Sequence, residues 1–560
     1  MRWIFPEDIE ADVPKHLAND LHIPVSIAEL IARRGFTTPE KAKAYLKPKL
    51  AALSDPFLLP DMQQAVDRIL HAIDAKERIV LYGDYDVDGV SSLALLRCVL
   101  QEMGAQVSCF LPVRSGEGYG LSKEGVLRCK QQWNPQLLIA VDCGTSAVQE
   151  IAALKADGIS VVVLDHHECP AQLPVCEAIV NPKRGGGYEY LCSVGIVFKL
   201  AHALLKTRRI PKLDLREYLD LVALGTLADL VPLHDENRIL VRRGLEQLGE
   251  TRWIGVKALM EVSGVKAPVE SGDVGFKLGP RMNAAGRLGT AEDALELLLT
   301  EDWDHATILA ERLDIQNRDR RAVEEHVFQE VEKQIKQNFQ PEQDIALIVG
   351  GDGWHPGVVG IVASRIMRKY HRPTFIVGFD EHGVGKGSGR SIRGLALVEA
   401  LQSCSAHLLK FGGHDMAAGV SVHRDHFEAF QKNFAIHARS VLDAEALQPS
   451  LEIDAELLVE EINTGMLEQY EALAPFGMGN PQPLFAVRGV TPVSPPRVLK
   501  DKHLQFVLKQ GRSTAKAIWF NAPIDALPPS PWDVAFELSR NDYQGTVSAQ
   551  ILVRGIRTAQ

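Results

Sequence analysis

Three aspartates at alternate positions follow an apolar run near residue 80. The sequence there is Ile79-Val80-Leu81-Tyr82-Gly83-Asp84-Tyr85-Asp86-Val87-Asp88-Gly89. In an extended backbone, residues i, i+2 and i+4 face the same way, so the three carboxylates are expected to share one small volume. Like charges this close repel one another unless a cation lies among them. The stretch predicts a hard divalent metal at the mouth of a sheet, and the alternative is a solvated acidic turn.

Further candidate ligands follow other apolar runs. Asp142 comes after Leu137–Val141, and Asp165-His166-His167-Glu168 comes after Val161–Leu164. Asp229 is the only charge between Leu221 and Leu233. A carboxylate among apolar neighbours is costly unless it is paired or bound to a metal. Several separate element ends therefore deliver oxygen or imidazole ligands.

The elements that must position these ligands alternate between strand and helix from about 78 to 200. The expected strands are Ile79–Tyr82, Val107–Leu111, Leu137–Val141, Val161–Leu164 and Ala178–Val180. Continuous apolar strands separated by helices predict a parallel sheet that is covered on both faces. Sites of such sheets lie beyond the carboxyl ends of the strands, which is where the acids fall.

The motifs resemble a known family. Asp84-x-Asp86-x-Asp88-Gly89, Asp142-x-Gly144, Asp165-His166-His167 and Asp229 are similar, in order, to the four motifs of the DHH phosphoesterases. The match is close to the RecJ family of single-strand-specific exonucleases, and the stretch from Leu111 to Gly120 strengthens it. The resemblance covers nearly the whole chain.

By this resemblance the motif residues have defined roles. Asp86 and Asp88 are metal ligands, and Asp142 bridges two metal ions. His166 and Asp229 complete the second ion. His167 touches the phosphate, and Asp84 is a ligand or orients one.

Ligand chemistry agrees with this assignment. Carboxylates with one imidazole suit Mn²⁺ or Mg²⁺ better than zinc. Two such ions roughly 3.5–4 Å apart can share a carboxylate and activate water for attack on phosphorus.

Glycine-rich segments outside the first motifs carry further candidates. Gly279 to Gly289 is expected to be a loop bearing two arginines, and Lys386 to Gly394 a flexible, locally basic loop. Phe411-Gly412-Gly413-His414, followed by Ala417-Ala418-Gly419, is expected to form a tight turn that bears a histidine. Glycines let a backbone approach a phosphate, and arginines can grip it with two hydrogen bonds. By the family resemblance His414 reaches the scissile phosphate, and the candidates for holding the substrate are Arg114, Arg281, Ser388, Arg390, Gly412 and Gly413.

The rest of the chain indicates an α/β fold with added domains. We expect an N-terminal helical segment at 1–77, a DHH catalytic domain at 78–300, a long connecting helix at 301–340 and a smaller α/β DHHA1 domain at 341–445. Short alternating segments in 446–560 predict a small barrel, and the resemblance implies an OB-fold there. Phe506, Trp519 and Tyr543 could stack on bases, although each is also a candidate core residue.

Composition limits the alternatives. With 46% hydrophobic and 24% charged residues, the 560-residue chain has the composition of an ordinary globular protein. A net charge of −11 argues against an indiscriminately basic nucleic-acid coat. None of the eight cysteines forms a CxxC pair, and the first residues lack an apolar signal region. These features predict a cytoplasmic protein that does not enter a membrane.

The leading hypothesis is an exonuclease that digests single-stranded DNA from the 5′ end to 5′-mononucleotides, in recombination and repair. The 5′ polarity, the choice of DNA, and the partners come from the resemblance alone; the partners are single-strand-binding protein and a recombination helicase, with the protein a monomer. One alternative is a phosphodiesterase for short oligonucleotides or cyclic dinucleotides, and another is a non-catalytic DNA-binding scaffold. Deletion of residues 446–560 is expected to discriminate a polymer substrate from a short one.

Overall fold

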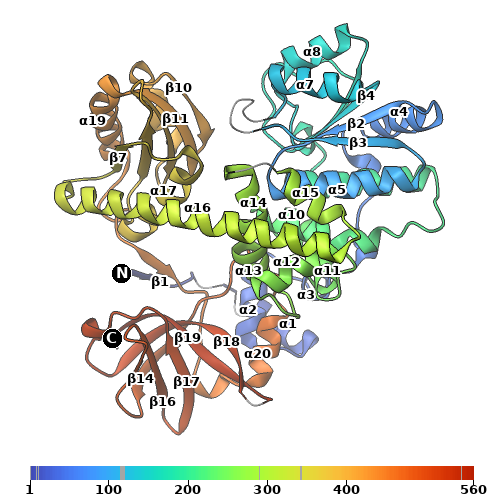
Figure 1. Ribbon diagram of the computed structural model, residues 1–560. Helices are drawn as coiled ribbons and strands as arrows, with labels where there is room; N and C mark the ends of the chain where they lie inside the picture. The colour runs from blue at the N-terminus through green and yellow to red at the C-terminus, as the bar shows by residue number, and fades with distance from the viewer. Residues whose placement is uncertain are drawn as a thin grey trace. The chain divides into compact units, whose positions relative to one another are not determined.

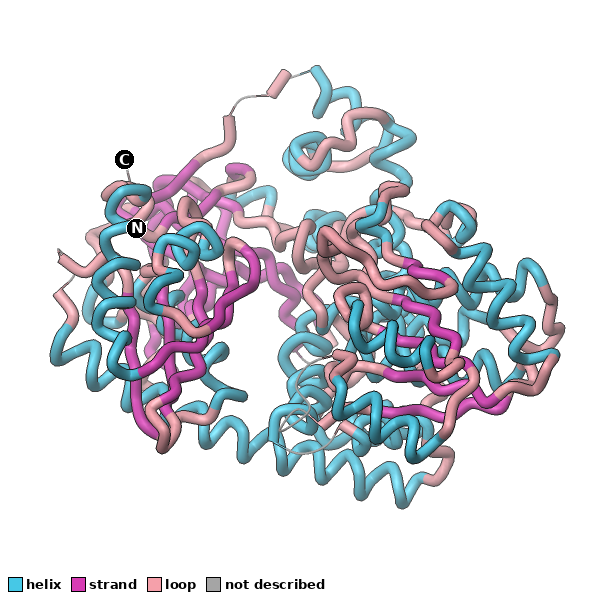
Figure 2. The backbone as a smooth tube through the Cα atoms, turned by 90° about the horizontal axis from the view of Figure 1, so that it is seen from above, coloured by secondary structure: helices cyan, strands magenta, loops and turns pink. Residues whose placement is uncertain are grey.

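The computed structural model describes residues 2–7, 9–10, 12–113, 120–288, 291–340, 343–543 and 545–559. Figure 1 traces the chain from blue to red and labels its elements, and Figure 2 shows that helices and strands both contribute throughout. The chain divides into a larger unit, which holds the parallel sheet and the C-terminal barrel, and a smaller unit built mainly from residues 312–451. Among the described residues, no helix has both the length and the apolar character needed to span a bilayer.

The predicted parallel sheet is confirmed in the larger unit. Its five strands lie in the order β3-β2-β4-β5-β6, and every neighbouring pair is parallel. Helices α7 and α8 lie on one face and α5 on the other, which explains the continuous apolar runs (Figure 1). The strands are β2 Arg78–Tyr82, β3 Gln106–Phe110, β4 Leu137–Val141, β5 Ser160–Leu164 and β6 Ala178–Val180. The helices of this region are α5 Val87–Glu102, α7 Lys123–Trp133, α8 Val148–Ala156, α9 Ser193–Thr207 and α10 Leu219–Ala228.

Helices flank this sheet domain on both sides in the sequence. The N-terminal ones are α1 Asp12–Leu21, α2 Val25–Arg33, α3 Pro39–Leu46 and α4 Met62–Asp74, preceded by the short strand β1 Arg2–Ile4, which the sequence did not predict. The later ones are α11 Asp235–Leu248, α12 Ile254–Ser263, α14 Gly279–Leu288 and α15 Glu292–Leu299.

The expected loop from Gly279 onward is wrong, because this segment is helix α14. Its small residues mark close contacts with the metal-ligand motifs. A Cβ at Gly286 would lie 2.8 Å from the carbonyl oxygen of Tyr85. The side-chain oxygen of Asn283 accepts the backbone N–H of Val87 at 3.1 Å. These positions share one helix face, so α14 packs directly on the segment that carries Asp84, Asp86 and Asp88.

The long helix expected from 301 to 340 is present as α16 Trp303–Asn338. In the smaller unit a mixed sheet has the order β10-β11-β9-β8-β7, in which only the pair β7–β8 is parallel. Its strands are β7 Leu347–Asp352, β8 Thr374–Phe379, β9 Val384–Arg390, β10 Lys410–His414 and β11 Ala417–His423, and its main helices are α17 Pro356–Tyr370, α18 Leu397–Ser403 and α19 Arg424–Val441.

Two expected loops of this unit are strands. Ser388 and Arg390 lie on β9, which pairs with both β8 and β11, so the prediction of a flexible loop is wrong. A Cβ at Gly389 would lie 2.3 Å from the ring of Phe375, so the glycine makes room for a core side chain. Gly412 and Gly413 lie on β10, and the hairpin turn itself follows His414. At Gly389 and Gly413 the missing side chain allows close packing within the sheet.

The C-terminal segment forms the predicted barrel. Its sheet has the order β13-β14-β18-β19-β17-β16-β15, and an additional pairing of β14 with β16 closes five of the strands into a ring. The longer strands are β14 Phe485–Pro492, β16 His503–Gln510, β17 Ser513–Trp519, β18 Trp532–Tyr543 and β19 Thr546–Thr558. The shorter elements are β12 Ser450–Glu452, β13 Ala455–Glu456, β15 Arg497–Leu499 and α20 Thr464–Glu471.

Two arginines of α11 tie the barrel segment to the rest of the larger unit. Arg238 donates to the carbonyl oxygens of Tyr45 at 2.9 Å and Ala474 at 3.0 Å. Arg242 donates to the carbonyl oxygens of Leu46 at 3.1 Å and Ala474 at 3.1 Å. Tyr45 and Leu46 are the last residues of α3, and Ala474 lies just after α20, where the last carbonyls of a helix lack partners within it. One arginine pair thus closes the ends of two helices from distant parts of the chain.

Gly286→Ala is expected to lower the free energy of unfolding by about 1–3 kcal/mol, because the new methyl overlaps the Tyr85 backbone. Chemical denaturation of the metal-free protein measures this change. Gly275→Ala is the matched control, since a Cβ there meets nothing within 4 Å. Equal stability of the two variants would contradict the proposed contact between α14 and the aspartate segment.

Candidate metal centre

The carboxyl ends of the parallel strands bring the candidate ligands together. Asp142 directly follows β4 and Asp165 directly follows β5, and each backbone N–H pairs with the next strand, to Leu164 O at 2.9 Å and Val180 O at 3.2 Å. Asp142 has a φ of +62°, a left-handed conformation that is uncommon for residues other than glycine. The ends of β4 and β5 therefore fix the backbone positions from which the side chains of Asp142 and Asp165 project.

The first motif does not stay extended to Asp88, as its spacing led us to expect, because helix α5 begins at Val87. Asp86 is the N-cap of α5, and its Oδ1 accepts the N–H of Gly89 at 3.0 Å. Asp88 is already in the first helical turn, where successive side chains turn by about 100° rather than alternate. As a result, one ligand group consists of Asp84, Asp86 and Asp142, with one donor atom from each within 4.8 Å of the others. The expectation that Asp84, Asp86 and Asp88 face one volume is wrong.

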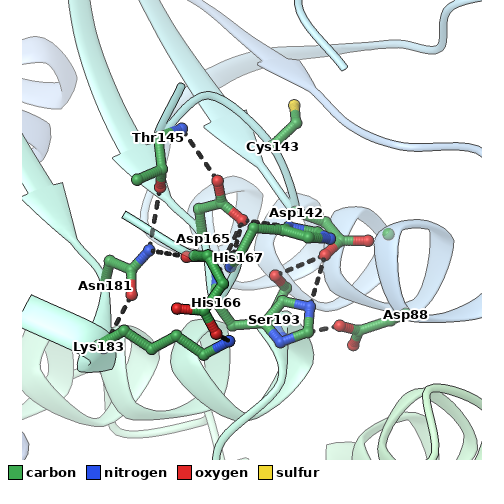
Figure 3. A network of polar contacts seen from close by, with 12 residues as sticks. Asp88, Asp142, Cys143, Thr145, Asp165, His166, His167, Asn181, Lys183 and Ser193 are labelled. Atoms are coloured by element: carbon green, nitrogen blue, oxygen red, sulfur yellow. Dashed lines mark hydrogen bonds and ion pairs between the residues drawn. The ribbon is translucent and has the colours of Figure 1, made fainter. Parts of the chain in front are cut away.

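Asp88 instead points to the start of α9. Its Oδ2 accepts the N–H of Ser193 at 2.7 Å (Figure 3). Its Oδ1 accepts the N–H of Val194 at 2.9 Å. It shares a second potential ligand group with Cys192 and Asp229. The free N–H groups at a helix N-terminus stabilise a carboxylate there.

His166 lies between two acids from different elements. Its Nε2 is 3.4 Å from Asp142 Oδ1 and 3.7 Å from Asp229 Oδ2. Burial, followed by the charge of His167, lowers the pKa of His166 to about 3. The imidazole is therefore neutral at physiological pH, which is the form that ligates metals.

Asp165 organises the second histidine, a role that the sequence did not assign to it. Its Oδ1 accepts from His167 Nδ1 at 2.7 Å and from the N–H of His166 at 2.8 Å, and its Oδ2 accepts the N–H of Thr145 at 2.9 Å (Figure 3). Burial alone would raise the pKa of Asp165, but the bond and charge of His167 hold it below its usual value. The position of Asp165 immediately before two histidines is the signal that could have indicated this role.

His167 is held by the same contact. Burial acts to lower its pKa, but the hydrogen bond and charge of Asp165 outweigh burial, and the pKa is raised. The contact through Nδ1 fixes the orientation of the imidazole ring. One donor atom each from His167, His166 and Asp142 also lie within 4.8 Å of one another.

The acids repel one another strongly in the absence of a cation. Burial, and then the charge of Asp86, raise the pKa of Asp88 to about 7. Burial, and then the charges of Asp88 and Asp86, raise the pKa of Asp229 to about 9. Burial and the same neighbours also raise the pKa of Asp142 well above its usual value. These shifts mark a site where positive charge is required to keep the carboxylates ionised.

The donor set fits hard divalent ions. It consists of carboxylate oxygens and imidazole, which suit Mn²⁺ and Mg²⁺. The Oδ2 atom of Asp229 is buried and accepts no hydrogen bond from the residues that the structure describes. A buried acceptor without a donor is costly, and a metal ion would satisfy it. The residues present can therefore hold a divalent ion.

The predicted substrate residues are distributed over both units. Arg281 lies on α14 in the larger unit, and its Nη1 donates to Lys277 O at 2.7 Å. Arg390 lies on β9 of the smaller unit, where its Nη1 donates to Ser388 Oγ at 2.9 Å. Burial lowers the pKa of Arg390 below its usual value. His414 is exposed at the end of β10, and Arg114 lies outside the described residues.

The aromatic candidates of the barrel differ from one another. Phe506 is only 4% exposed and lies 5.9 Å from the ring of Trp532 in the core, so a base-stacking role for it is wrong. Strand alternation points its side chain inward. Trp519 is half-buried against the same core, and stacking by it stays a prediction. The side chain of Tyr543 lies outside the described part of the chain.

Three parts of the chain match domain families of known proteins. Residues 78–226 match the DHH family, N-terminal domain, and residues 343–436 match the DHHA1 domain. Residues 453–555 match the RecJ OB domain. Fold and site together are those of a DHH protein.

Similarity over nearly the whole chain defines the family more narrowly than the separate domains do. The chain is 37% identical over 563 residues to the single-stranded-DNA-specific exonuclease RecJ of Bacillus subtilis, covering 99% of this chain and 70% of that protein. It is 34% identical to that of Escherichia coli, covering 98% and 97%. The crystal structure of RecJ in complex with Mn²⁺ from Thermus thermophilus has a TM-score of 0.86 and 31% identity, covering 100% of this chain and 80% of that one. The chain belongs to the RecJ family.

Metal-free protein is expected to lose stability as the pH rises. The carboxyls of Asp88 and Asp229 have folded-state pKa values of about 7 and about 9. Unfolded aspartate titrates near pH ~3.9, so the folded state binds extra protons above that pH. The contribution of these two carboxyls to the free energy of unfolding is fully present below pH ~4 and is lost as the pH rises to about 9. Thermal melts in chelator between pH 5 and 9 measure this loss.

Asp229→Asn provides the comparison for that experiment, because it keeps the side-chain volume and removes the titration. Its melting temperature is expected to fall less steeply with pH than that of the wild type. Added Mn²⁺ should stabilise the wild type increasingly as the pH rises, since the ion binds ionised carboxylates. Parallel slopes for the wild type and Asp229→Asn in chelator would refute the raised pKa of Asp229.

Proposed function

We propose that this protein is a metal-dependent exonuclease that hydrolyses single-stranded DNA from the 5′ end, releasing 5′-mononucleotides in DNA recombination and repair. The observation that carries the proposal is the convergence of Asp84, Asp86, Asp142, His166 and Asp229 at one edge of the sheet. It is supported by near-full-length similarity to proteins named as single-stranded-DNA-specific exonucleases.

The metal centre would hold two ions, Mn²⁺ or Mg²⁺. Asp84, Asp86 and Asp142 form one set of ligands, while Asp88, His166 and Asp229 form the other, with Asp142 shared. Support comes from the two ligand groups that contain Asp142 and from the position of His166 beside both Asp142 and Asp229. The chemistry that the bound ions would supply is activation of water and neutralisation of phosphate charge.

His167 is proposed to contact the substrate phosphate. Asp165 holds its Nδ1 at 2.7 Å and raises its pKa, which favours the protonated imidazole. The imidazole is less buried than Asp165, with 41% of its side chain exposed against 2%. A cationic N–H donor beside the ligands would bind a non-bridging phosphate oxygen and share its developing charge.

The remaining substrate residues are proposed from the family resemblance. Arg281, Ser388, Arg390 and Arg114 would hold the 5′ end, with Gly412, Gly413 and His414 close to the scissile phosphate. Arg390 is supported by its anchoring to Ser388 and Gly389, which leaves its planar guanidinium preorganised. Trp519 and Tyr543 are proposed to stack on bases.

The cellular setting is proposed on the same basis. The substrate is single-stranded DNA, the protein is a monomer, and it works in the cytoplasm with single-strand-binding protein and a recombination helicase. The eight cysteines are all free thiols, as expected in a reducing compartment.

Asp142→Ala is expected to reduce exonuclease turnover by more than about 100-fold, because the change removes the shared ligand. The assay follows end-labelled single- and double-stranded oligonucleotides, with and without a 5′ phosphate, in Mn²⁺ or chelator. Mononucleotides released from the 5′ end of the single strand alone support the proposal. Hydrolysis confined to very short oligonucleotides would favour the alternative substrate, and activity in chelator would overturn the metal assignment.

Arg390→Ala is expected to weaken binding of single-stranded DNA and to reduce the slope of log K against log salt by about 0.7, the loss of one phosphate contact. Fluorescence anisotropy in chelator measures this without hydrolysis. Lys432→Ala, which removes an exposed charge paired with Glu428 in the same unit, is the control. An unchanged salt slope in Arg390→Ala would exclude a phosphate contact.

A further inference from the structure

Ser193 contacts two of the candidate ligands at once. It is the first residue of α9, its side chain is fully buried, and its backbone N–H donates to Asp88 at 2.7 Å. Its hydroxyl donates to Oδ1 of Asp142 at 2.8 Å (Figure 3). Asp88 comes from α5 and Asp142 from the end of β4, so one residue links acids from two separate elements.

The start of α9 is built around this arrangement. The N-cap residue, Cys192, makes no side-chain capping bond. The first N–H groups of the helix are satisfied by Asp88 instead. A serine at the first helical position has no helical carbonyl four residues before it, so its hydroxyl is available for Asp142 rather than for its own helix.

Asp142 needs such a restraint. Its backbone is in the left-handed region at φ +62°, and strained conformations persist only where the surroundings determine them strongly. Oδ1, the oxygen bound by Ser193, is also the oxygen 3.4 Å from His166 Nε2. A hydrogen bond to Oδ1 restrains the plane of the carboxylate, and the orientation of that plane decides where its oxygens point.

We propose that Ser193 is a positioning residue of the metal centre, whose hydroxyl fixes the orientation of Asp142 relative to Asp88 and His166. This inference rests on the proposed metal-dependent function. Hydrogen bonds to ligating carboxylates orient them, and removing such a bond typically weakens metal binding by about 10–100-fold. Ser193 would act through Asp142 and Asp88, the two candidate ligands that it contacts.

The test is calorimetric titration of the full-length, metal-free protein with Mn²⁺. Ser193→Ala is expected to raise the dissociation constant by about 10–100-fold, with a small change in the melting temperature of the metal-free protein. Exonuclease turnover at saturating Mn²⁺ should recover more than turnover at low Mn²⁺. A purely structural role would lower the melting temperature without this metal-dependent rescue.

Ser26→Ala is the matched control. Ser26 is a buried serine near the start of helix α2, and its hydroxyl has no hydrogen-bond partner among the described residues. This variant should bind Mn²⁺ as the wild type does. Ser193→Thr keeps the hydroxyl and should retain wild-type affinity, which carries the test if Ser193→Ala fails to fold.

The outcomes separate the inference from the proposed function. If the wild type binds Mn²⁺ and Ser193→Ala binds it within about twofold, the positioning role is wrong and the metal centre stands. Lost affinity in folded Ser193→Thr would likewise contradict a role for the hydroxyl. If the wild type itself binds no Mn²⁺, the proposed function fails together with the inference.

Discussion

Electrostatic repulsion among buried carboxylates is the constraint on which this structure depends. Asp88, Asp142 and Asp229 are largely removed from water, and burial together with neighbouring carboxylates raises the pKa of each. Such a cluster reduces stability unless a cation or protons compensate for it. The destabilising cluster lies at one edge of a sheet, where several parallel strands end together.

The surrounding elements hold the acids in place with backbone dipoles. Asp86 caps α5, and Asp88 caps α9 across the domain. Asp165 uses three backbone N–H groups and one imidazole to orient the histidine pair. Helix α14 supports the segment from Asp84 to Asp88, because Asn283 accepts the N–H of Val87. Most of these hydrogen bonds come from backbone amides, which do not titrate and carry no net charge, so they persist when the pH or the salt concentration changes.

The sequence predicted the sheet well and pointed to acids and histidines that the structure brings close together, because apolar runs and the acids that follow them are local signals. It predicted the direction of Asp88 wrongly, since alternate spacing says nothing about a helix that begins at Val87. It mistook the glycines of α14 and β9 for loops, because glycine marks close approach as well as turns. Ser193 and Asn283 were missed for a related reason: their roles depend on contacts with residues about 50 and 200 positions away.

The arginine pair of α11 makes the barrel part of the same cooperative structure as the N-terminal helices. Residues such as Leu17 and Ile31 share one core with Phe485 and Phe536 of the barrel. Burial already lowers the pKa of Arg238 to about 10. Truncation of the chain before the barrel would therefore remove a hydrogen-bond acceptor from this desolvated guanidinium and expose the shared core to water. A truncated chain would therefore report damage to the fold rather than the contribution of the barrel to strand capture. That contribution is better measured with substitutions on the barrel surface.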